Sequence, residues 1–207
     1  MRIKTFHKPF RLGLTGSIGM GKSTTAQIFR DLGYPVYDAD AEVHKLYASG
    51  GEGAKLIHAV FPDAINDDGA VDRKILSTHI QADPLNLVVL ESFIHPMLET
   101  ARDEFFKANS HHDILIYDIP ILYETGGERD VDAVVVVTAP DDVQRKRVMA
   151  REGMTQDLFE SLLVRQLPDS EKRKRADFLI FTDKGLDFAR EQVQSIIHKI
   201  KTQIING

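Results

Sequence analysis

The chain has 207 residues, enough for one good-sized domain with a small inserted subdomain. Its net charge of −5 excludes the strongly basic field of a general nucleic-acid binder, and with no cysteine it has neither disulfides nor a thiolate site. The longest strongly apolar run, residues 133–137, is far too short to span a bilayer, and residues 1–8 lack the apolar region of a signal peptide. We therefore expect a cytoplasmic protein that binds neither nucleic acid nor membrane; its oligomeric state is left open.

The first predicted elements are a strand at residues 10–15 and a helix at residues 24–32 with apolar residues at helical spacing. The loop between them, Gly16-Ser17-Ile18-Gly19-Met20-Gly21-Lys22-Ser23, fits the phosphate-binding pattern G-x-x-x-x-G-K-[ST]. Its glycines let successive N–H groups point inward around phosphate oxygens, and the helix adds the positive end of its dipole. The pattern predicts nucleotide binding, with Lys22 reaching the β- and γ-phosphates and the Ser23 hydroxyl binding Mg²⁺.

A brief strand at residues 36–37 leads to Asp38-Ala39-Asp40 and a helix at residues 41–47. Aspartate often caps a helix in this position. Capping explains one of the two aspartates and leaves the other without a structural role. A carboxylate near the γ-phosphate can accept a proton from an attacking hydroxyl or help to hold Mg²⁺. We predict that Asp40 is the catalytic base, with Asp38 as the weaker candidate.

Residues 49–111 read as a helical insertion without strands. Helices are predicted at residues 54–61, 72–80, 85–93 and 97–107, around a polar loop at 62–69. Proline disfavours a helical conformation in the residue just before it. At His95-Pro96 the third helix is therefore expected either to kink or to continue through the proline. His95 is either a packed structural residue or a ligand contact.

Three further strands are predicted at residues 114–117, 131–138 and 178–181, alternating with helices at 141–152, 155–166 and from Leu186 to Ile204. This rhythm predicts an α/β fold with a parallel five-stranded sheet between helical layers. Ligands bind at the carboxyl ends of such strands, so five polar residues are expected near the phosphate loop: Thr15, Asp38, Asp40, Asp118 and Thr182. Asp118 either supports Mg²⁺ or forms a cap before Pro120.

Arginines are frequent between residues 144 and 175. Arg147 and Arg151 are four residues apart and so share a helix face, and arginine forks match phosphate oxygens. The alternative is a solvated basic face. The run at 172–175 predicts a charged helix face near the phosphate site. With few apolar anchors, residues 154–175 are expected to form a mobile lid, called the lid segment below.

The motifs together resemble the dephospho-coenzyme A kinase family. The phosphate loop, D-A-D at Asp38–Asp40, G-x-x-D-R ending at Arg73 and L-E with H-P at His95 occur in the family's order. Asp118-Ile119-Pro120-Ile121-Leu122-Tyr123-Glu124 is similar to the family's D-I-P-L-L-F-E, and Gln166 and Ala176-Asp177 complete the order. The resemblance covers nearly the whole chain.

This resemblance implies ATP-dependent phosphorylation of the ribose 3′-hydroxyl of dephospho-coenzyme A, the last step of coenzyme A biosynthesis. It also implies a nucleotide-kinase-like P-loop core (8–48, 112–153, 176–207), a helical acceptor-binding insertion (49–111) and the lid (154–175). The implied catalytic residues are Asp40, Lys22, Arg147 and Thr15. Those for ATP are Gly16, Gly19, Met20, Gly21, Lys22, Ser23, Thr24 and Arg151. Those for the acceptor are Asp38, Arg73, His95, Asp118 and Glu124, and Mg²⁺ falls to Ser23, with Asp118 as a second ligand candidate.

Two departures from the family pattern are visible. Thr182-Asp183-Lys184-Gly185 stands where the family has Asn-x-Gly. This difference weakens the inference that Thr182 contacts the base of the nucleotide. Met20 stands where a small residue is usual, and we expect its side chain to point outward.

Two other readings remain. Another small-molecule P-loop kinase, for a nucleoside or nucleotide, would keep the core and differ in the insertion. A GTP-dependent switch should carry N-K-x-D and D-x-x-G, and neither pattern occurs in the chain.

Overall fold

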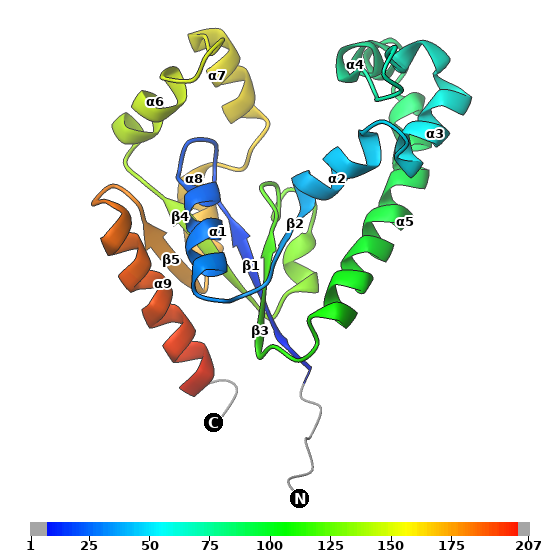
Figure 1. Cartoon of the computed structure of the whole chain (residues 1–207). Helices are drawn as coiled ribbons and strands as arrows, with labels where there is room; N and C mark the ends of the chain where they lie inside the picture. The colour runs from blue at the N-terminus through cyan, green and yellow to red at the C-terminus, as the bar shows by residue number, and fades with distance from the viewer. Residues whose placement is uncertain (1–7, 203–207) are drawn as a thin grey trace, which may run out of the picture. The chain divides into compact units, whose positions relative to one another are not determined.

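The computed structural model describes residues 8–202 and shows a five-stranded sheet in the order β2-β3-β1-β4-β5 (Figure 1). β1 pairs in parallel with β3 and β4, and β4 with β5. The strands are Phe10–Thr15 (β1), Val36–Asp38 (β2), Ile114–Asp118 (β3), Ala133–Thr138 (β4) and Phe178–Phe181 (β5). The predicted α/β fold with a parallel five-stranded sheet is confirmed. Residues 1–7 and Ile204, on which two expectations rested, lie outside the described residues.

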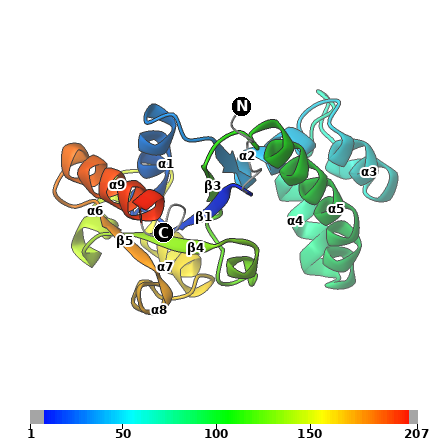
Figure 2. The same ribbon diagram turned by 90° about the horizontal axis from the view of Figure 1, so that it is seen from below.

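Alternate residues of the central strands face different cores, as the pleat requires. Val135 and Val137 pack with Leu12 and Leu14 against α1 (Lys22–Asp31) and α9 (Leu186–Ile200). Val134 and Val136 face the other way, toward a cluster that includes Leu122. Figure 2 shows α1 and α9 together on one side of the sheet and α8 (Asp169–Arg175) on the other. Burial on both faces explains why β4 is an uninterrupted apolar run.

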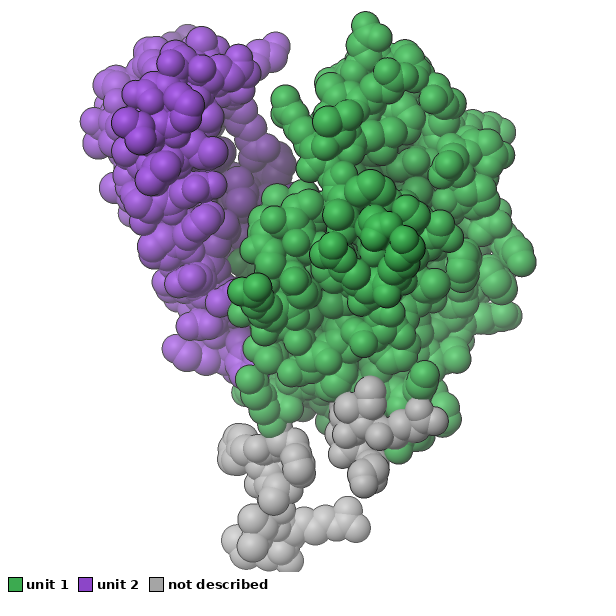
Figure 3. All heavy atoms as spheres, turned by 180° about the vertical axis from the view of Figure 1, so that it is seen from behind, with its two compact units in different colours: residues 1–37, 109–207 green, residues 38–108 purple. Residues whose placement is uncertain are grey.

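The chain divides into two compact units, residues 1–37 with 109–207 and residues 38–108 (Figure 3). The sequence placed the insertion at 49–111, and the difference comes from α2 (Ala39–Tyr47). Leu46 and Tyr47 pack against the apolar cluster around Ile57, so α2 belongs to the helical unit.

The helical unit also contains α3 (Glu52–Val60), a short 3₁₀ helix (Pro62–Ala64), α4 (Arg73–Ala82) and α5 (Leu85–Ala108). Pro96 lies within α5, so the helix does not end at the proline. Asp72 caps α4 by accepting hydrogen bonds from the N–H groups of Lys74 and Ile75.

The remaining helices of the first unit are α6 (Asp141–Met149), α7 (Gln156–Val164) and a 3₁₀ turn (Gly127–Asp130). α7 and α8 lie in the lid segment. Contrary to expectation, this segment has firm anchors: Phe159 of α7 is buried, and Lys172 of α8 is fully buried. None of the helices among residues 8–202 is long and apolar enough to cross a membrane.

Tyr123 carries a buried polar atom that no described residue satisfies. The residue is 8% exposed, and its hydroxyl has no hydrogen-bond partner within residues 8–202. Burial, with the negative charges of Asp177 and Glu128, raises the pKa of Tyr123 to about 12. The hydroxyl stays neutral in the folded protein at pH values that ionise a solvated tyrosine.

We expect Tyr123→Phe to raise the free energy of unfolding at pH 7 by about 1 kcal/mol, because it removes an unpaired buried hydroxyl. Above about pH 10 the unfolded tyrosine ionises while the folded one does not, so wild type loses stability between pH 10 and 12. The phenylalanine ring has no proton to lose, so the advantage of the variant should grow over that range. Urea unfolding at pH 7 and at pH 10–11 measures both effects; a variant less stable than wild type at either pH contradicts the interpretation.

Candidate active site

The phosphate loop connects β1 to α1, and its glycines are required by both conformation and space. Gly19 and Gly21 have φ values of 78° and 95°, in the left-handed region that favours glycine. A Cβ atom on Gly19 would lie 2.4 Å from Cγ2 of Val148, and one on Gly16 would lie 2.6 Å from the carbonyl oxygen of Val137. The loop is therefore closely packed on β4 and α6.

Several loop N–H groups have no acceptor in the protein. Among residues 8–202, the backbone N–H groups at five positions donate to no protein group: Gly19, Gly21, Lys22, Ser23 and Thr24. Gly21 is the N-cap of α1 and offers no side-chain cap, and the first turn carries no acidic residue. Unpaired donors at the positive end of a helix dipole form a binding site for an anion such as phosphate.

Lys22 is held at this site by Asp118. Lys22 Nζ lies 2.6 Å from Asp118 Oδ1, and their side chains are 15% and 4% exposed. Asp118 is opposite Leu14 in the register of β1 and β3, which brings the end of β3 to the start of the loop. The expectation that Asp118 lies near the loop is confirmed.

Thr15 and Thr182 are both buried beside the loop, as expected. The Thr15 hydroxyl donates to the carbonyl of Pro120 at 2.9 Å. The Thr182 hydroxyl donates to the carbonyl of Met20 at 2.8 Å, and its N–H donates to the carbonyl of Thr138. The Thr182 hydroxyl therefore supports the phosphate loop through its hydrogen bond to Met20 and is already engaged with protein groups.

Arg147 reaches the loop from α6, and its guanidinium binds protein groups. It donates to the hydroxyl of Thr182 at 2.8 Å and to the Thr182 carbonyl at 2.7 Å, and it lies 3.5 Å from the carbonyl of Gly19. Arg151, one turn later, is exposed. Contact of either arginine with phosphate stays a prediction.

The expectation that Met20 points outward is wrong. Its side chain is 1% exposed, and its sulfur accepts a hydrogen bond from the N–H of Ala139 at 3.2 Å. Met20 therefore fixes the loop to the connection between β4 and α6. The predicted contact of Met20 with the nucleotide is compatible with a buried side chain, because that contact would use the backbone.

Four predicted residues belong to the helical unit: Asp38, Asp40, Arg73 and His95. Asp38 caps α2 by accepting a hydrogen bond from the N–H of Ala41 at 3.0 Å, which confirms the capping alternative for one of the pair. Asp40 lies exposed in the first turn of α2, as His95 does on α5. The Arg73 guanidinium stacks on the ring of Tyr47, 5.4 Å from its centroid. The roles of Asp40, Arg73 and His95 stay predictions.

Glu124, expected to bind the acceptor, holds parts of its own chain together. Its carboxylate accepts a hydrogen bond from the N–H of Leu167 at 2.7 Å and lies 2.9 Å from Lys172 Nζ. Lys172 also donates to the carbonyl of Pro120 at 3.1 Å. The predicted charged helix face at 172–175 thus contains one buried lysine that joins α8 to the segment after β3.

Two glutamines contact the loop although no role was predicted for either. Gln144 and Gln166 bind the two backbone groups of Ile18. Gln166 was visible only as a member of the family's residue order, and nothing in the spacing of Gln144 distinguished it from a polar helix residue. Such contacts depend on tertiary packing.

The site fits Mg²⁺ only together with a nucleotide. Within the described residues no group of three or more His, Cys, Asp or Glu side chains could hold a metal ion. Mg²⁺ in phosphoryl transfer commonly takes one or two protein oxygens together with substrate phosphates and water. The Ser23 hydroxyl at the start of α1 and the Asp118 carboxylate beside Lys22 are oxygen ligands of the right kind.

A parallel sheet of this order, carrying a nest of free N–H groups with a lysine at the carboxyl end of β1, defines a P-loop kinase with a nucleotide-kinase-like core. The family model for dephospho-CoA kinase matches residues 10–187. The chain is 51% identical to the dephospho-CoA kinase of Ruegeria pomeroyi over 96% of this chain and 99% of that one. The chain therefore belongs to the dephospho-CoA kinase family.

Two solved structures share this fold. A crystal structure of a Thermus thermophilus protein is 31% identical, with a TM-score of 0.82 over 92% of this chain and 97% of that one. The dephospho-CoA kinase from Campylobacter jejuni is 24% identical, with a TM-score of 0.63 over 94% of this chain and 98% of that one, and it supports the fold alone.

We expect Met20→Ala to lower the free energy of unfolding by about 2–5 kcal/mol, because it opens a cavity beneath the phosphate loop. Met149→Ala is the matched control: Met149 is 38% exposed on α6, and its loss should change stability by less than about 0.5 kcal/mol. Urea unfolding measures both. If Met20→Ala changed stability as little as Met149→Ala, the Met20 side chain would have to point outward, as first expected.

Proposed function

We propose that this kinase transfers the γ-phosphoryl group of ATP to the ribose 3′-hydroxyl of dephospho-coenzyme A, giving coenzyme A and ADP. The observation that carries the proposal is the nest of unpaired N–H groups beside Lys22, in a chain of the dephospho-CoA kinase family. The nest recognises phosphate whatever is attached to it. The choice of acceptor rests on the family relation and on residues outside the nest.

The first unit supplies the groups for ATP. The N–H groups of Gly19 and of residues 21–24 bind the phosphates, and Lys22 offsets the charge that builds up on them during transfer. Asp118 keeps the Lys22 ammonium at the loop when no nucleotide is bound. Ser23, with Asp118 as a second candidate, would hold Mg²⁺, which neutralises phosphate charge and draws electrons from the β–γ bridge.

Asp40 is proposed as the group that receives the proton. The acceptor oxygen forms a bond to the γ-phosphorus as the bond to the β–γ bridging oxygen breaks, and ADP departs with that electron pair. The hydroxyl proton passes to the Asp40 carboxylate late in the transfer. Arg73, His95 and Glu124 are proposed acceptor contacts, and Arg147 and Arg151 proposed phosphate contacts.

Incubating the protein with ATP, Mg²⁺ and dephospho-coenzyme A, and following coenzyme A by mass, tests the reaction. A panel of nucleosides and nucleotides as acceptors separates this activity from that of another small-molecule kinase. Turnover of a nucleoside in preference to dephospho-coenzyme A would refute the proposed acceptor.

Asp40→Asn should lower kcat by roughly 10²–10⁴, because asparagine keeps the shape of the side chain but cannot take the proton. The KM for ATP should change little, since the loop is untouched. Asp38→Asn is the control: an asparagine still caps a helix, and its stability should fall by no more than about 1 kcal/mol with most turnover retained. Steady-state kinetics with urea unfolding compares the two. If Asp38→Asn abolishes turnover and Asp40→Asn does not, the base is Asp38.

A further inference from the structure

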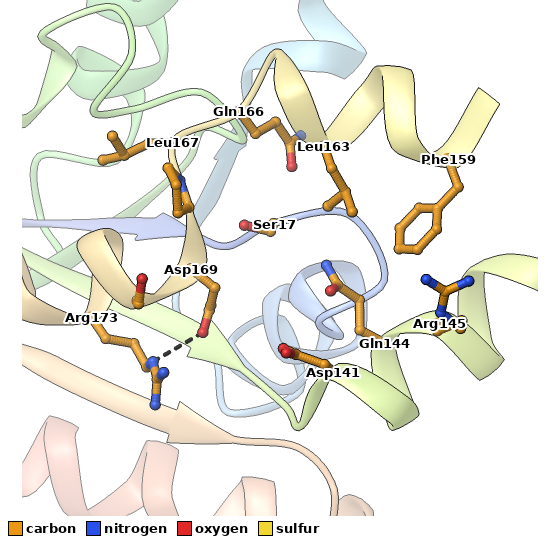
Figure 4. Close-up of a pocket in the computed structure, with 12 residues that line it drawn as sticks. Ser17, Asp141, Gln144, Arg145, Phe159, Leu163, Gln166, Leu167, Asp169 and Arg173 are labelled. Carbon is orange, nitrogen blue, oxygen red and sulfur yellow. Dashed lines mark ion pairs between the residues drawn. The ribbon is translucent and has the colours of Figure 1, made fainter. Parts of the chain in front are cut away.

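Two glutamine side chains hold the two backbone groups of Ile18 in the phosphate loop. Gln144 Nε2 donates to the Ile18 carbonyl at 2.8 Å, and the Ile18 N–H donates to Gln166 Oε1 at 3.0 Å. Gln144 comes from α6, and Gln166 follows the end of α7. Both line one cavity of about 440 Å³, together with Ser17 of the loop. Figure 4 shows the three side chains around this cavity. We call Gln144 and Gln166 the glutamine clamp.

The contact from Gln144 sets the direction of a phosphate-binding donor. The carbonyl of Ile18 and the N–H of Gly19 belong to the same planar trans peptide, so they point in opposite directions. Holding this carbonyl toward Gln144 turns the Gly19 N–H away from α6, and that N–H is one of the unpaired donors of the nest. Gln144 is 6% exposed and has little freedom to release the carbonyl.

The contact from Gln166 acts on the preceding peptide in the same way. The Ile18 N–H points toward Gln166, so the carbonyl of Ser17 points the opposite way, where it accepts the N–H of Met20 at 3.1 Å. With both peptide planes around Ile18 held, its φ and ψ angles are fixed. The clamp therefore sets the curl of the loop before nucleotide binds.

The clamp also connects the loop to the chain on both sides of α7. Gln144 precedes α7 in the chain and Gln166 follows it. The position of Gln166 is maintained by its neighbour Leu167, whose N–H donates to Glu124, and by the buried ion pair of Glu124 with Lys172. Movement of α6, or of the chain just after α7, would therefore act on the loop through these contacts.

We propose that Gln144 and Gln166 are positioning residues that orient the loop's phosphate donors and couple the loop to the lid segment. Their kinetic role rests on the proposed use of ATP, whereas their effect on the ligand-free loop does not. The clamp has a polarity: position 144 supplies a donor and position 166 supplies an acceptor. This polarity makes a crossed test possible.

The test replaces each glutamine by glutamate and by methionine. Glutamate at 166 keeps the acceptor for the Ile18 N–H, whereas methionine loses it. Glutamate at 144 sets an acceptor against the Ile18 carbonyl, so it should be worse than methionine there. In the ligand-free protein, hydrogen exchange of the Ile18 and Met20 amides should quicken by about tenfold in Gln166→Met and stay near wild type in Gln166→Glu. At position 144 it should quicken more in the glutamate variant than in the methionine variant.

Gln156→Met is the matched control, because Gln156 lies on α7 and binds Arg145 rather than the loop. Its loop exchange should equal that of wild type. The proposal would be overturned if loop exchange were faster in the glutamate variant than in the methionine variant at both positions. It would also be overturned if loop exchange were unchanged in Gln144→Met and Gln166→Met.

The kinetic arm uses the two methionine variants, which add no charge near phosphate. Each should raise the KM for ATP by about tenfold and leave the KM for dephospho-coenzyme A unchanged. A merely structural role predicts a lower Tm with both KM values unchanged, and that result would overturn the proposal. Wild type that makes no coenzyme A would refute the proposed function, while the exchange arm, which contains no nucleotide, would still decide whether the clamp holds the loop.

Discussion

The phosphate loop must keep several backbone N–H groups unpaired until an anion arrives, and the surrounding structure depends on this constraint. A loop with free N–H groups tends to fold back onto its own carbonyls, because a polar group without a hydrogen-bond partner costs free energy. Side chains from distant elements prevent this by taking the carbonyls: Thr182 holds that of Met20, and Gln144 holds that of Ile18. The carbonyls face outward because they are bonded there, and the N–H groups face the opposite way.

Buried charges next to the loop are paired so that they fix segments that would otherwise move independently. Asp118 ties the end of β3 to Lys22, and Glu124 with Lys172 ties the segment after β3 to α8. The carbonyl of Pro120 accepts from both Thr15 and Lys172, so one oxygen joins β1 to α8. Removing either charge of a buried pair leaves the other uncompensated, which is more costly than the pair is stabilising. Such pairs therefore fix arrangement more than they add stability.

Local pattern predicted the parts of this molecule whose cause is local. The apolar runs of β1, β3, β4 and β5, the glycine loop and the cap at Asp38 all depend on residues close in sequence. Met20 was placed wrongly because its burial depends on Ala139, 119 residues away. Lys172 was taken as part of a charged helix face, and its burial could not be predicted because its partner Glu124 comes from a distant segment of the chain. The packing of Leu46 and Tyr47 of α2 on helices that follow them also depends on residues distant in sequence.

The division of the chain bears on how acceptor choice arises. Backbone N–H groups and one lysine recognise phosphate without regard to the molecule that carries it, so the loop and its supports serve any reaction of ATP. Selection of an acceptor must come from side chains elsewhere. Asp40, Arg73 and His95 all belong to residues 38–108, whose core of Ile57, Leu90 and Ile94 is separate from that of the sheet. A unit with its own core can change its exposed residues without disturbing the peptide planes of the loop. If these residues select the acceptor as proposed, that independence lets the phosphate chemistry stay constant while the selecting surface varies.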